Sequence, residues 1–427
     1  MQLNISIEIG GEEYSVGRII GESVQNACFS YNEEYISSAE SIPVSVSLPF
    51  QREAFTPEQT RCFFEGLLPE GFTRKTVAEW IHADDRNYLG ILYALGKECL
   101  GALKVTDADR QENIPFAYEK LTLAQVRALA QEGASKSAEL VTKSHLSLTG
   151  ASGKVGLYLD PAEHQWYLPV GSAPSTHIIK QSHIRLNAIV TNEQLSVLTA
   201  KKLGIEVPDT FIINTGNYED ADVLFATSRY DRVFSQHSLS ADGHLVPLRL
   251  HQEDFCQALG VPASAKYEPA GRHYLKDMFA LLRRSSSDPV ADQLKLWDMI
   301  VFNFLLGNTD AHLKNYSLLH GQNPKILRLA PAYDLVSTSA YKSSTRDLSF
   351  RIGGKLSLDE IDHAAFAEAA KEAGLGKRIA LQHLDTLTDH FEAALQSASS
   401  ELSASGYDEA PAITKQILHT GGIARLR

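Results

Sequence analysis

Residues 299–315 read MIVFNFLLGNTDAHLKN. The first part is apolar apart from Asn303 and continues the three- and four-residue spacing of the residues before it, which predicts a buried helix. The polar run NTDAHLKN begins where this helix ends, and residues 316–319 are apolar again. A polar loop anchored on both sides is held rigidly, as preorganised catalysis requires.

Asp310 and Asn315 lie five residues apart in this loop. In a kinase catalytic loop, an Asp accepts the proton of the substrate hydroxyl and an Asn five residues later binds Mg²⁺. Short patterns of this kind occur by chance, so the hypothesis needs a second carboxylate from another element. Asp334, in LRLAPAYDLVST, supplies one. Alone it would be a turn-forming residue, but beside Asp310 and Asn315 it predicts a metal ligand.

His312 opens an alternative. A His two residues from Asp310 also suggests a metal-dependent hydrolase that uses His312, Asp310 and Asp334 as ligands. No second His follows at helical spacing, and no G-x-S-x-G elbow of a serine hydrolase occurs. We therefore favour phosphoryl transfer and expect His312 to orient the loop by hydrogen bonding.

The phosphate-binding side is expected in a region of short strands, where residues 149–156 read TGASGKVG. Small residues such as Gly150, Ala151, Ser152 and Gly153, followed by Lys154, let backbone N–H groups approach phosphate oxygens. This is no Walker A loop, because a strand and not a helix follows, and a plain hairpin turn stays an alternative. Lys180 ends the strand THIIK and Glu193 opens the next helix, which suits a phosphate-binding Lys and its Glu partner, although surface charges are the commoner case.

Composition narrows the class of protein. The chain has 427 residues, ordinary for two or three domains, and a net charge of −12, which disfavours autonomous binding to a nucleic-acid backbone. Its four cysteines lie far apart, without zinc or redox spacing. The first residues alternate like a strand and not like a signal peptide, and no apolar run is long enough for a membrane span. We expect a cytoplasmic protein.

The order of expected elements predicts an α+β fold. Strands are expected near residues 4–9 and 44–48, helices over 57–71, 74–83 and 87–96, and strands again over 145–180. A helix over 192–205, further strands and a long helical segment follow. The predicted domains are an N-terminal subdomain (1–110), a lobe with the glycine loop and hinge (111–245) and a helical lobe (246–427).

With these motifs assembled, the chain resembles the HipA family of serine/threonine kinase toxins of bacterial toxin–antitoxin modules. The resemblance rests on LLPEG (67–71), GKECLGAL (96–103), SLTGASGK, STHIIK, SRYDR, NTDAHLKN, APAYDL and RIGGK (351–355), in the order of the family. It implies a protein-kinase-like two-lobed α+β fold with an additional N-terminal β-rich subdomain, and ATP with Mg²⁺ as phosphoryl donor.

The resemblance also implies residue roles. Asp310 would be the catalytic base, Asn315 and Asp334 the metal ligands, and Lys180 a phosphate contact, with His312 and Lys314 beside the nucleotide. The hinge that holds adenine would include Ser228, Tyr230 and Asp231; Ser228 stands where the family usually has Glu, which leaves a side-chain contact there open.

Regulation and partners follow from the same resemblance. Family members phosphorylate a serine at the glycine loop, and Ser147 matches it, with Thr149 and Ser152 as alternatives because Ser152 replaces the usual Gln. The partner would be a helix-turn-helix antitoxin of the HipB type, which binds operator DNA. The substrate would be a component of translation such as an aminoacyl-tRNA synthetase. Two other readings are a small-molecule kinase and a non-catalytic scaffold or corepressor.

Overall fold

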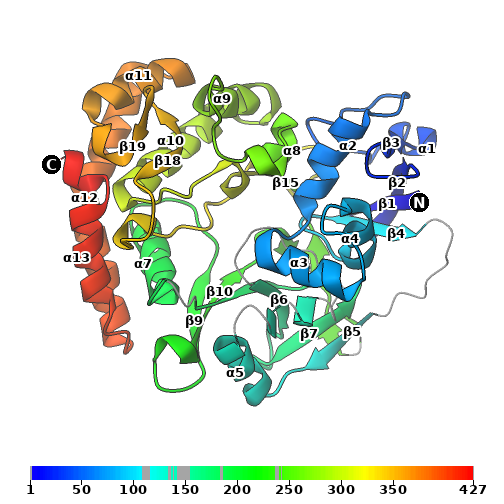
Figure 1. Cartoon of the computed structure of the whole chain (residues 1–427), viewed down its shortest axis with the longest axis horizontal. Coiled ribbons are helices and arrows are strands. Elements are labelled where there is room, and N and C mark those ends of the chain that lie inside the picture. Colours follow the sequence, from blue (N-terminus) through cyan, green and yellow to red (C-terminus); the bar gives the residue numbers. More distant parts are fainter. Residues whose placement is uncertain are drawn as a thin grey trace. The chain divides into compact units, whose positions relative to one another are not determined.

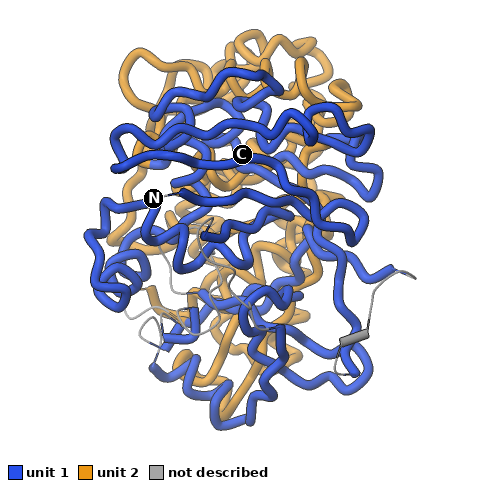
Figure 2. The backbone as a smooth tube through the Cα atoms, turned by 90° about the vertical axis from the view of Figure 1, so that its right-hand side faces the viewer, with its two compact units in different colours: residues 1–181, 226–263, 318–327 blue, residues 182–225, 264–317, 328–427 orange. Residues whose placement is uncertain are grey.

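The computed structural model describes residues 2–107, 116–132, 136–137, 139–141, 154–182, 186–235, 240–241 and 243–426. The chain forms two compact units (Figures 1 and 2). Unit 1 contains residues 1–181, 226–263 and 318–327, and unit 2 contains residues 182–225, 264–317 and 328–427. The domain boundaries predicted near residues 110 and 245 stay predictions.

The N-terminal part of unit 1 is a four-stranded antiparallel sheet in the order β3-β2-β1-β4. The predicted strand over residues 4–9 is confirmed as part of β1, and Gly10 and Gly11 turn the chain with φ of 63° and 93°. Alternate residues of β1 are buried, as its polar and apolar alternation predicts. The elements are β1 (Gln2–Ile9), β2 (Glu12–Ile20), β3 (Cys28–Tyr31), α1 (Glu33–Ile36), α2 (Pro57–Phe64), η1 (Glu65–Leu67), α3 (Gly71–Trp80), α4 (Tyr88–Leu95) and β4 (Leu103–Asp107).

The predicted strand over residues 44–48 is wrong. Only an isolated bridge joins Ser45 to Leu48. Side chains take the backbone groups that a neighbouring strand would need: the N–H of Val44 donates to Tyr31 Oη, and the N–H of Val46 donates to Glu253 Oε1. Val44 and Leu48 are buried, but so is the polar Ser45, whereas Val46 is only partly buried, so the alternation of this segment reflects neither strand pairing nor a single buried face.

The second sheet of unit 1 contains β5, β7, β6 and β8 in this order, all antiparallel. It confirms the strands predicted around residues 154–160, 165–170 and 176–180. The elements are β5 (Phe116–Lys120), α5 (Leu123–Glu132), β6 (Lys154–Leu159), β7 (Trp166–Gly171), β8 (His177–Gln181), β11 (Arg232–Val233), β12 (Ser240–Ala241), β13 (His244–Leu245), β14 (Leu248–Arg249), β15 (Gln252–Asp254), α8 (Phe255–Leu259) and β16 (Ser317–His320).

Unit 2 is mainly helical, with α10 packed against α9 and α12, and α12 packed in turn against α7 and α13 (Figure 1). The predicted helix over residues 192–205 begins three residues earlier, after Ala188 in the left-handed region. The elements are α7 (Ile189–Lys202), β9 (Thr210–Asn214), η2 (Asp220–Asp222), β10 (Val223–Ser228, shared with unit 1), η3 (Ala263–Ala265), α9 (Tyr274–Ser285), α10 (Pro289–Leu306), η4 (Leu313–Asn315), β17 (Leu327–Leu329), η5 (Thr338–Ala340), β18 (Asp347–Ile352), β19 (Lys355–Ser357), η6 (Leu358–Glu360), α11 (His363–Ala373), α12 (Lys377–Ala404), α13 (Ala410–Thr420) and α14 (Ile423–Leu426).

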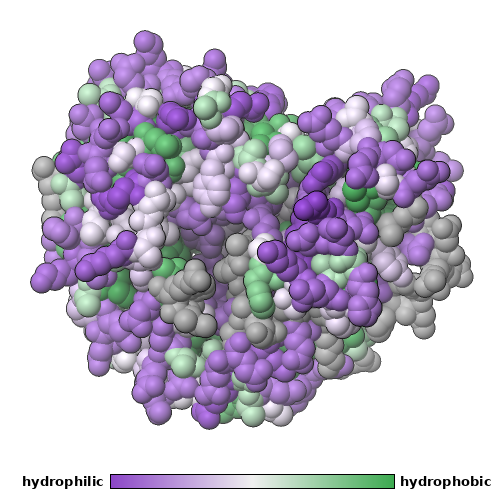
Figure 3. Space-filling model, in the orientation of Figure 1, coloured by the Kyte–Doolittle hydropathy of each residue, from purple (hydrophilic) through white to green (hydrophobic). Residues whose placement is uncertain are grey.

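The surface of the molecule is mainly hydrophilic on the face that Figure 3 shows. Hydrophobic residues form small separate patches on this face. Across the described residues, no helix combines the length and the apolar character needed to cross a membrane.

Candidate functional site

The predicted catalytic loop begins where α10 ends. Gly307 closes the helix in the left-handed conformation, φ 74°, and a Cβ there would lie 2.0 Å from Ser339 Oγ, so the position requires glycine. Asn308 then turns back on the helix, and its amide donates to Asn303 Oδ1 at 2.8 Å. Asn303, the one polar residue of the apolar run, therefore anchors the loop that follows.

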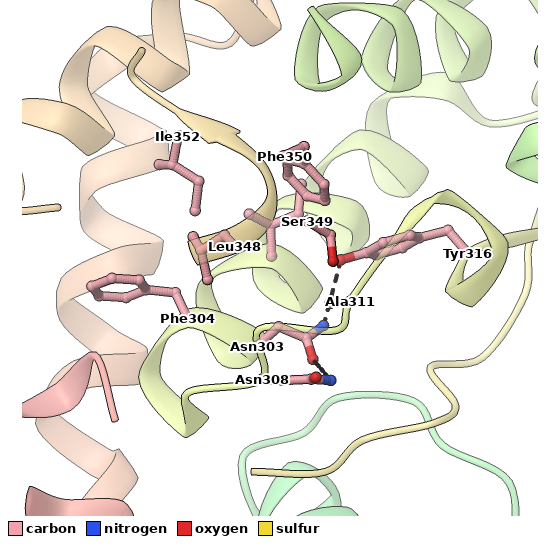
Figure 4. A pocket seen from close by; sticks show the side chains of 10 residues that line it. Asn303, Phe304, Asn308, Ala311, Tyr316, Leu348, Ser349, Phe350 and Ile352 are labelled. Carbon is pink, nitrogen blue, oxygen red and sulfur yellow. Dashed lines mark hydrogen bonds between the residues drawn. The ribbon is translucent and has the colours of Figure 1, made fainter. Parts of the chain in front are cut away.

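A small cavity of about 20 Å³ lies under this loop, lined by residues of α10, of the loop and of β18 (Figure 4). Asn303 reaches toward it from α10 and donates to Tyr316 Oη at 3.5 Å as well as to the carbonyl of Met299. Burial raises the pKa of Tyr316 well above its ordinary value. The loop thus rests on a nearly full core that leaves room for about one water molecule.

Three bonds fix the backbone of Asp310. Its N–H donates to Asn308 Oδ1 at 3.1 Å, and its carbonyl accepts from the N–H of His312 at 2.8 Å and from the amide of Asn315 at 2.9 Å. The side chain of Asp310 is exposed, and its Oδ1 accepts the hydroxyl of Tyr267 at 2.6 Å. A rigid loop therefore presents an accessible carboxylate, as the sequence predicts.

Asp334 is the second carboxylate, and its φ of 58° lies in the left-handed region that Asp tolerates better than most residues. Its carbonyl accepts from the amide of Asn308 at 3.3 Å, which joins its segment directly to the catalytic loop. The neighbouring Tyr333 hydroxyl donates to the carbonyl of Lys314 at 2.8 Å. The structure thus brings together the two segments that the sequence places two dozen residues apart.

Further bonds hold the segment after Asp334 in unit 2. Ser337 exchanges two hydrogen bonds of 3.0 Å with the side chain of Asn192 on α7, and its hydroxyl donates to the carbonyl of Leu306 at 2.7 Å. The N–H of Thr309 donates to Thr338 Oγ1 at 2.7 Å. Sequence reasoning missed Asn192, whose only signal is a polar residue on the buried face of a helix.

The side-chain oxygens of the catalytic loop and of the Asp334 segment are of the kinds that bind Mg²⁺. Carboxylate and amide oxygens are the hard ligands that this cation prefers. The amide nitrogen of Asn315 donates to Asp310, which turns the amide oxygen away from that bond. In the part of the chain that the structure describes, no cluster of three or more His, Cys, Asp and Glu side chains forms a metal site. Whether Asp334 and Asn315 bind Mg²⁺ stays a prediction.

His312 and Lys314 are both buried within the loop. The ring of His312 meets the ring of Tyr267 edge to face, with 5.2 Å between centroids. Lys314 lies in η4, where its carbonyl accepts from Tyr333. Whether His312 or Lys314 contacts a nucleotide stays a prediction.

In unit 1, Lys154 and Lys180 lie directly opposite each other on β6 and β8. Residues opposite each other in an antiparallel pair share one face, and like charges there disfavour the pairing. Two cations on one face suit a polyanionic ligand. Of the other residues predicted around the glycine loop, Ser147, Thr149, Gly150, Ala151, Ser152 and Gly153 lie outside the described residues. The predicted pairing of Lys180 with Glu193 stays a prediction.

Arg229 and Asp231 of the predicted hinge belong to a cluster of four buried charges, whose side chains are at most 2% exposed and which are Glu98, Arg229, Asp231 and Arg232. We call it the buried charge cluster. Glu98 accepts from Arg232 at 2.5 Å and from Arg229 at 3.1 Å, and Asp231 accepts from Arg229 at 2.8 Å. The sequence offered GKECLGAL and SRYDR as separate motifs, without a signal that their charges meet.

Asp231 is the hinge residue most affected by this cluster. Burial alone would raise its pKa, but the charges of Arg229 and Arg232, with hydrogen bonds from Arg229 and from the N–H of Gly101, lower the pKa far below its ordinary range. Gln252 Nε2 donates to the same carboxylate at 2.9 Å. We therefore assign the Asp231 side chain to the core of unit 1 instead of to adenine. Tyr230, whose hydroxyl donates to Gln252, and Ser228 are partly exposed.

Comparison with known proteins agrees with this geometry. The family model of the HipA-like C-terminal domain matches residues 146–395, and that of the HipA N-terminal domain matches residues 8–106. Y4mE of Sinorhizobium fredii, named as a candidate kinase, is 36% identical over 387 residues, covering 87% of this chain and 88% of its own. The serine/threonine-protein kinase toxin HipA of Shewanella oneidensis is 27% identical over 391 residues, covering 86% and 83%.

The fold comparison extends over nearly the whole chain. HipA of S. oneidensis, solved in a complex with HipB and operator DNA, superposes with a TM-score of 0.80 at 22% identity, covering 99% of this chain and 97% of that one. This confirms the predicted α+β, protein-kinase-like fold. Since the family model of the C-terminal domain alone spans more than half of the 427 residues, this chain belongs to the HipA family.

Proposed function

We propose that this chain is an ATP- and Mg²⁺-dependent serine/threonine protein kinase that acts as the toxin of a bacterial toxin–antitoxin module. The observation that carries the proposal is the catalytic loop of unit 2, where Asp310 is exposed on a backbone held by Asn308, His312 and Asn315. The names of the relatives, a candidate kinase and a serine/threonine-protein kinase toxin, support the same activity.

In this proposal Asp310 accepts the proton of the substrate hydroxyl as that oxygen attacks the γ-phosphorus. Asn315 and Asp334 supply oxygens to Mg²⁺, which neutralises charge on the phosphates when bound. Lys154 and Lys180, which lie opposite each other on β6 and β8, would bind the phosphates. His312 and Lys314 support the nucleotide side of the loop.

The nucleotide base would lie against the hinge, with contacts from Ser228 and Tyr230. The residues on either side of Tyr230 are held by the buried charge cluster, because the guanidinium of Arg229 donates two hydrogen bonds to the carboxylate of Asp231. A fixed backbone suits recognition of adenine by N–H and carbonyl groups. Gly150, Ala151, Ser152 and Gly153 would close over the phosphates.

We further propose that a helix-turn-helix antitoxin of the HipB type binds this chain and links it to operator DNA. The support is the likeness to S. oneidensis HipA, which was solved with HipB and its operator DNA. A net charge of −12 disfavours direct DNA binding and is compatible with a basic protein partner. The proposed substrate is a cytoplasmic component of translation such as an aminoacyl-tRNA synthetase, and autophosphorylation is proposed at Ser147, with Thr149 or Ser152 as alternatives.

The test compares the unmodified chain with Asp310→Asn, which keeps the size of the side chain and removes the base. Asp389→Asn, on the exposed face of α12, is the matched control. We expect transfer of labelled phosphate from ATP and growth arrest for the unmodified chain and the control, and at least a hundredfold slower transfer for Asp310→Asn. Equal transfer by all three proteins would contradict the proposal, and growth arrest without any transfer would favour a non-catalytic scaffold.

A further inference from the structure

Tyr267 lies against the candidate catalytic base. Its hydroxyl donates to Asp310 Oδ1 at 2.6 Å, and the residue is 46% exposed. A phenol hydroxyl is the same kind of donor as the hydroxyl of a serine, a threonine or water. On the basis of the proposed kinase function, we propose that Tyr267 is a gate. Its hydroxyl occupies the hydrogen-bonding position on Asp310 that the hydroxyl of the protein substrate must take before phosphate transfer.

The backbone around Tyr267 is anchored on both sides. Before it, the carbonyl of Lys266 accepts the N–H of Leu313, in the catalytic loop, at 3.3 Å. After it, the buried carboxylate of Glu268 accepts from the N–H of Tyr274 at 3.0 Å and from the N–H and guanidinium of Arg351 at 2.8 and 2.9 Å. The phenol therefore stands on a fixed support that aims it at Asp310.

The loop does not need this phenol in order to keep its shape. Asn308, His312 and Asn315 hold the backbone of Asp310 through three bonds that do not involve Tyr267. The hydroxyl of Tyr267 donates to the side-chain carboxylate of Asp310 and not to one of these three backbone bonds. Tyr267 is 46% exposed, so its ring can move toward solvent at the cost of its edge-to-face contact with His312, whereas the three backbone bonds of Asp310 stay in place.

The gate has a chemical consequence. When a water molecule reaches Asp310, its oxygen can attack the γ-phosphorus, the bond from that phosphorus to the bridging oxygen of ADP breaks, and the proton passes to the carboxylate, which wastes ATP as phosphate. A phenol on Oδ1 excludes water from this position, because a hydrogen bond to a charged group is among the stronger ones in proteins. A docked protein substrate brings its own hydroxyl in place of the phenol.

The experiment measures phosphate release from Mg-ATP by the full chain without a protein substrate. Tyr267→Phe removes only the hydroxyl. We expect hydrolysis to rise about tenfold, the factor that corresponds to the loss of one hydrogen bond to a charged group. The rise should be in kcat, with the KM for ATP unchanged. Tyr218→Phe, also 46% exposed and in unit 2, is the matched control and should leave hydrolysis unchanged.

The double variant Tyr267→Phe with Asp310→Asn should show no rise, because the gate acts through Asp310. Unchanged or slower hydrolysis by a folded Tyr267→Phe would overturn the gate, and a fall as deep as that of Asp310→Asn would make Tyr267 an orienting group. These outcomes differ from failure of the kinase proposal, in which neither the unmodified chain nor Tyr267→Phe turns over ATP and both inferences fall.

Discussion

Removal of one charge from the buried charge cluster gives the sharpest test of the fold. Glu98→Gln keeps the size of the side chain but leaves two arginines opposite one carboxylate, so the cluster changes from neutral to a net charge of +1. The amide also places an NH₂ group against guanidinium donors that the carboxylate accepts at 2.5 and 3.1 Å. Breaking a buried ion pair from one side costs about 3–5 kcal/mol, and we expect unit 1 to lose about that much.

Native-state hydrogen exchange suits the measurement, because the two units need not unfold in one transition. A loss of 3 kcal/mol should speed the slowest amides of β1 and β6 by roughly a hundredfold. Glu13→Gln is the control, since the pair of Glu13 with Lys104 involves a side chain that is 51% exposed, and we expect a loss of less than about 1 kcal/mol there.

Restoring neutrality should restore stability. In Glu98→Gln with Arg232→Met, one arginine again faces one carboxylate, and we expect the double variant to recover at least about 1 kcal/mol relative to Glu98→Gln. Two results would contradict the assignment of coupled buried charges. One is a loss of unfolding free energy in Glu98→Gln no larger than that in Glu13→Gln. The other is that Arg232→Met lowers the unfolding free energy as much in the Glu98→Gln background as it does in the unmodified chain.

Three further predictions concern single side chains. Burial raises the pKa of the Glu253 carboxyl to about 8 from an ordinary 4.5, so between these pH values the folded state holds a proton that the unfolded state has lost. Unit 1 should therefore lose stability as the pH rises from 4.5 toward 8. Glu253→Gln should remove this pH dependence of the unfolding free energy, measured by urea unfolding. Asp292→Asn, which weakens a buried acceptor of Arg328, Leu329 N–H and Ser286, should destabilise unit 2 by about 2 kcal/mol in the same assay. Asp334→Gly relieves a left-handed φ of 58° and should abolish phosphate transfer without lowering the melting temperature of unit 2.

The sequence predicts the catalytic loop well because its signals are local. An apolar helix, a glycine and a polar run lie next to one another, and α10, Gly307 and the bonds of Asn308 follow from them. The same holds for β6, β7 and β8, which are short strand-like runs separated by turn residues. The segments that carry Asp310 and Asp334 meet because the amide of Asn308, at the end of α10, donates to the carbonyl of Asp334.

What the sequence could not predict depends on contacts between distant residues. Residues 44–48 alternate like a strand, yet Tyr31 and Glu253 take their backbone groups. Tyr267 lies 43 residues before Asp310 and belongs to no repeating pattern. The sequence places Asp231 in the expected hinge, but nothing local shows that its carboxylate is buried against Arg229 and Arg232, or that Glu98, from another motif, pairs with the same two arginines.

The buried charge cluster also has a consequence for synthesis of the protein. Glu98 and Arg229 are 131 residues apart in the chain, and unit 1 includes residues as late as 327. At about 5–20 residues per second, a ribosome that has made Glu98 needs roughly 7–26 s to make Arg229. Until then the carboxylate must stay in water, since burying it alone is too costly. All strands of the sheet β1–β4 are made by residue 107, but the partners of Glu98 are not, so the surroundings of this carboxylate can close only after residues 229–232 have been translated.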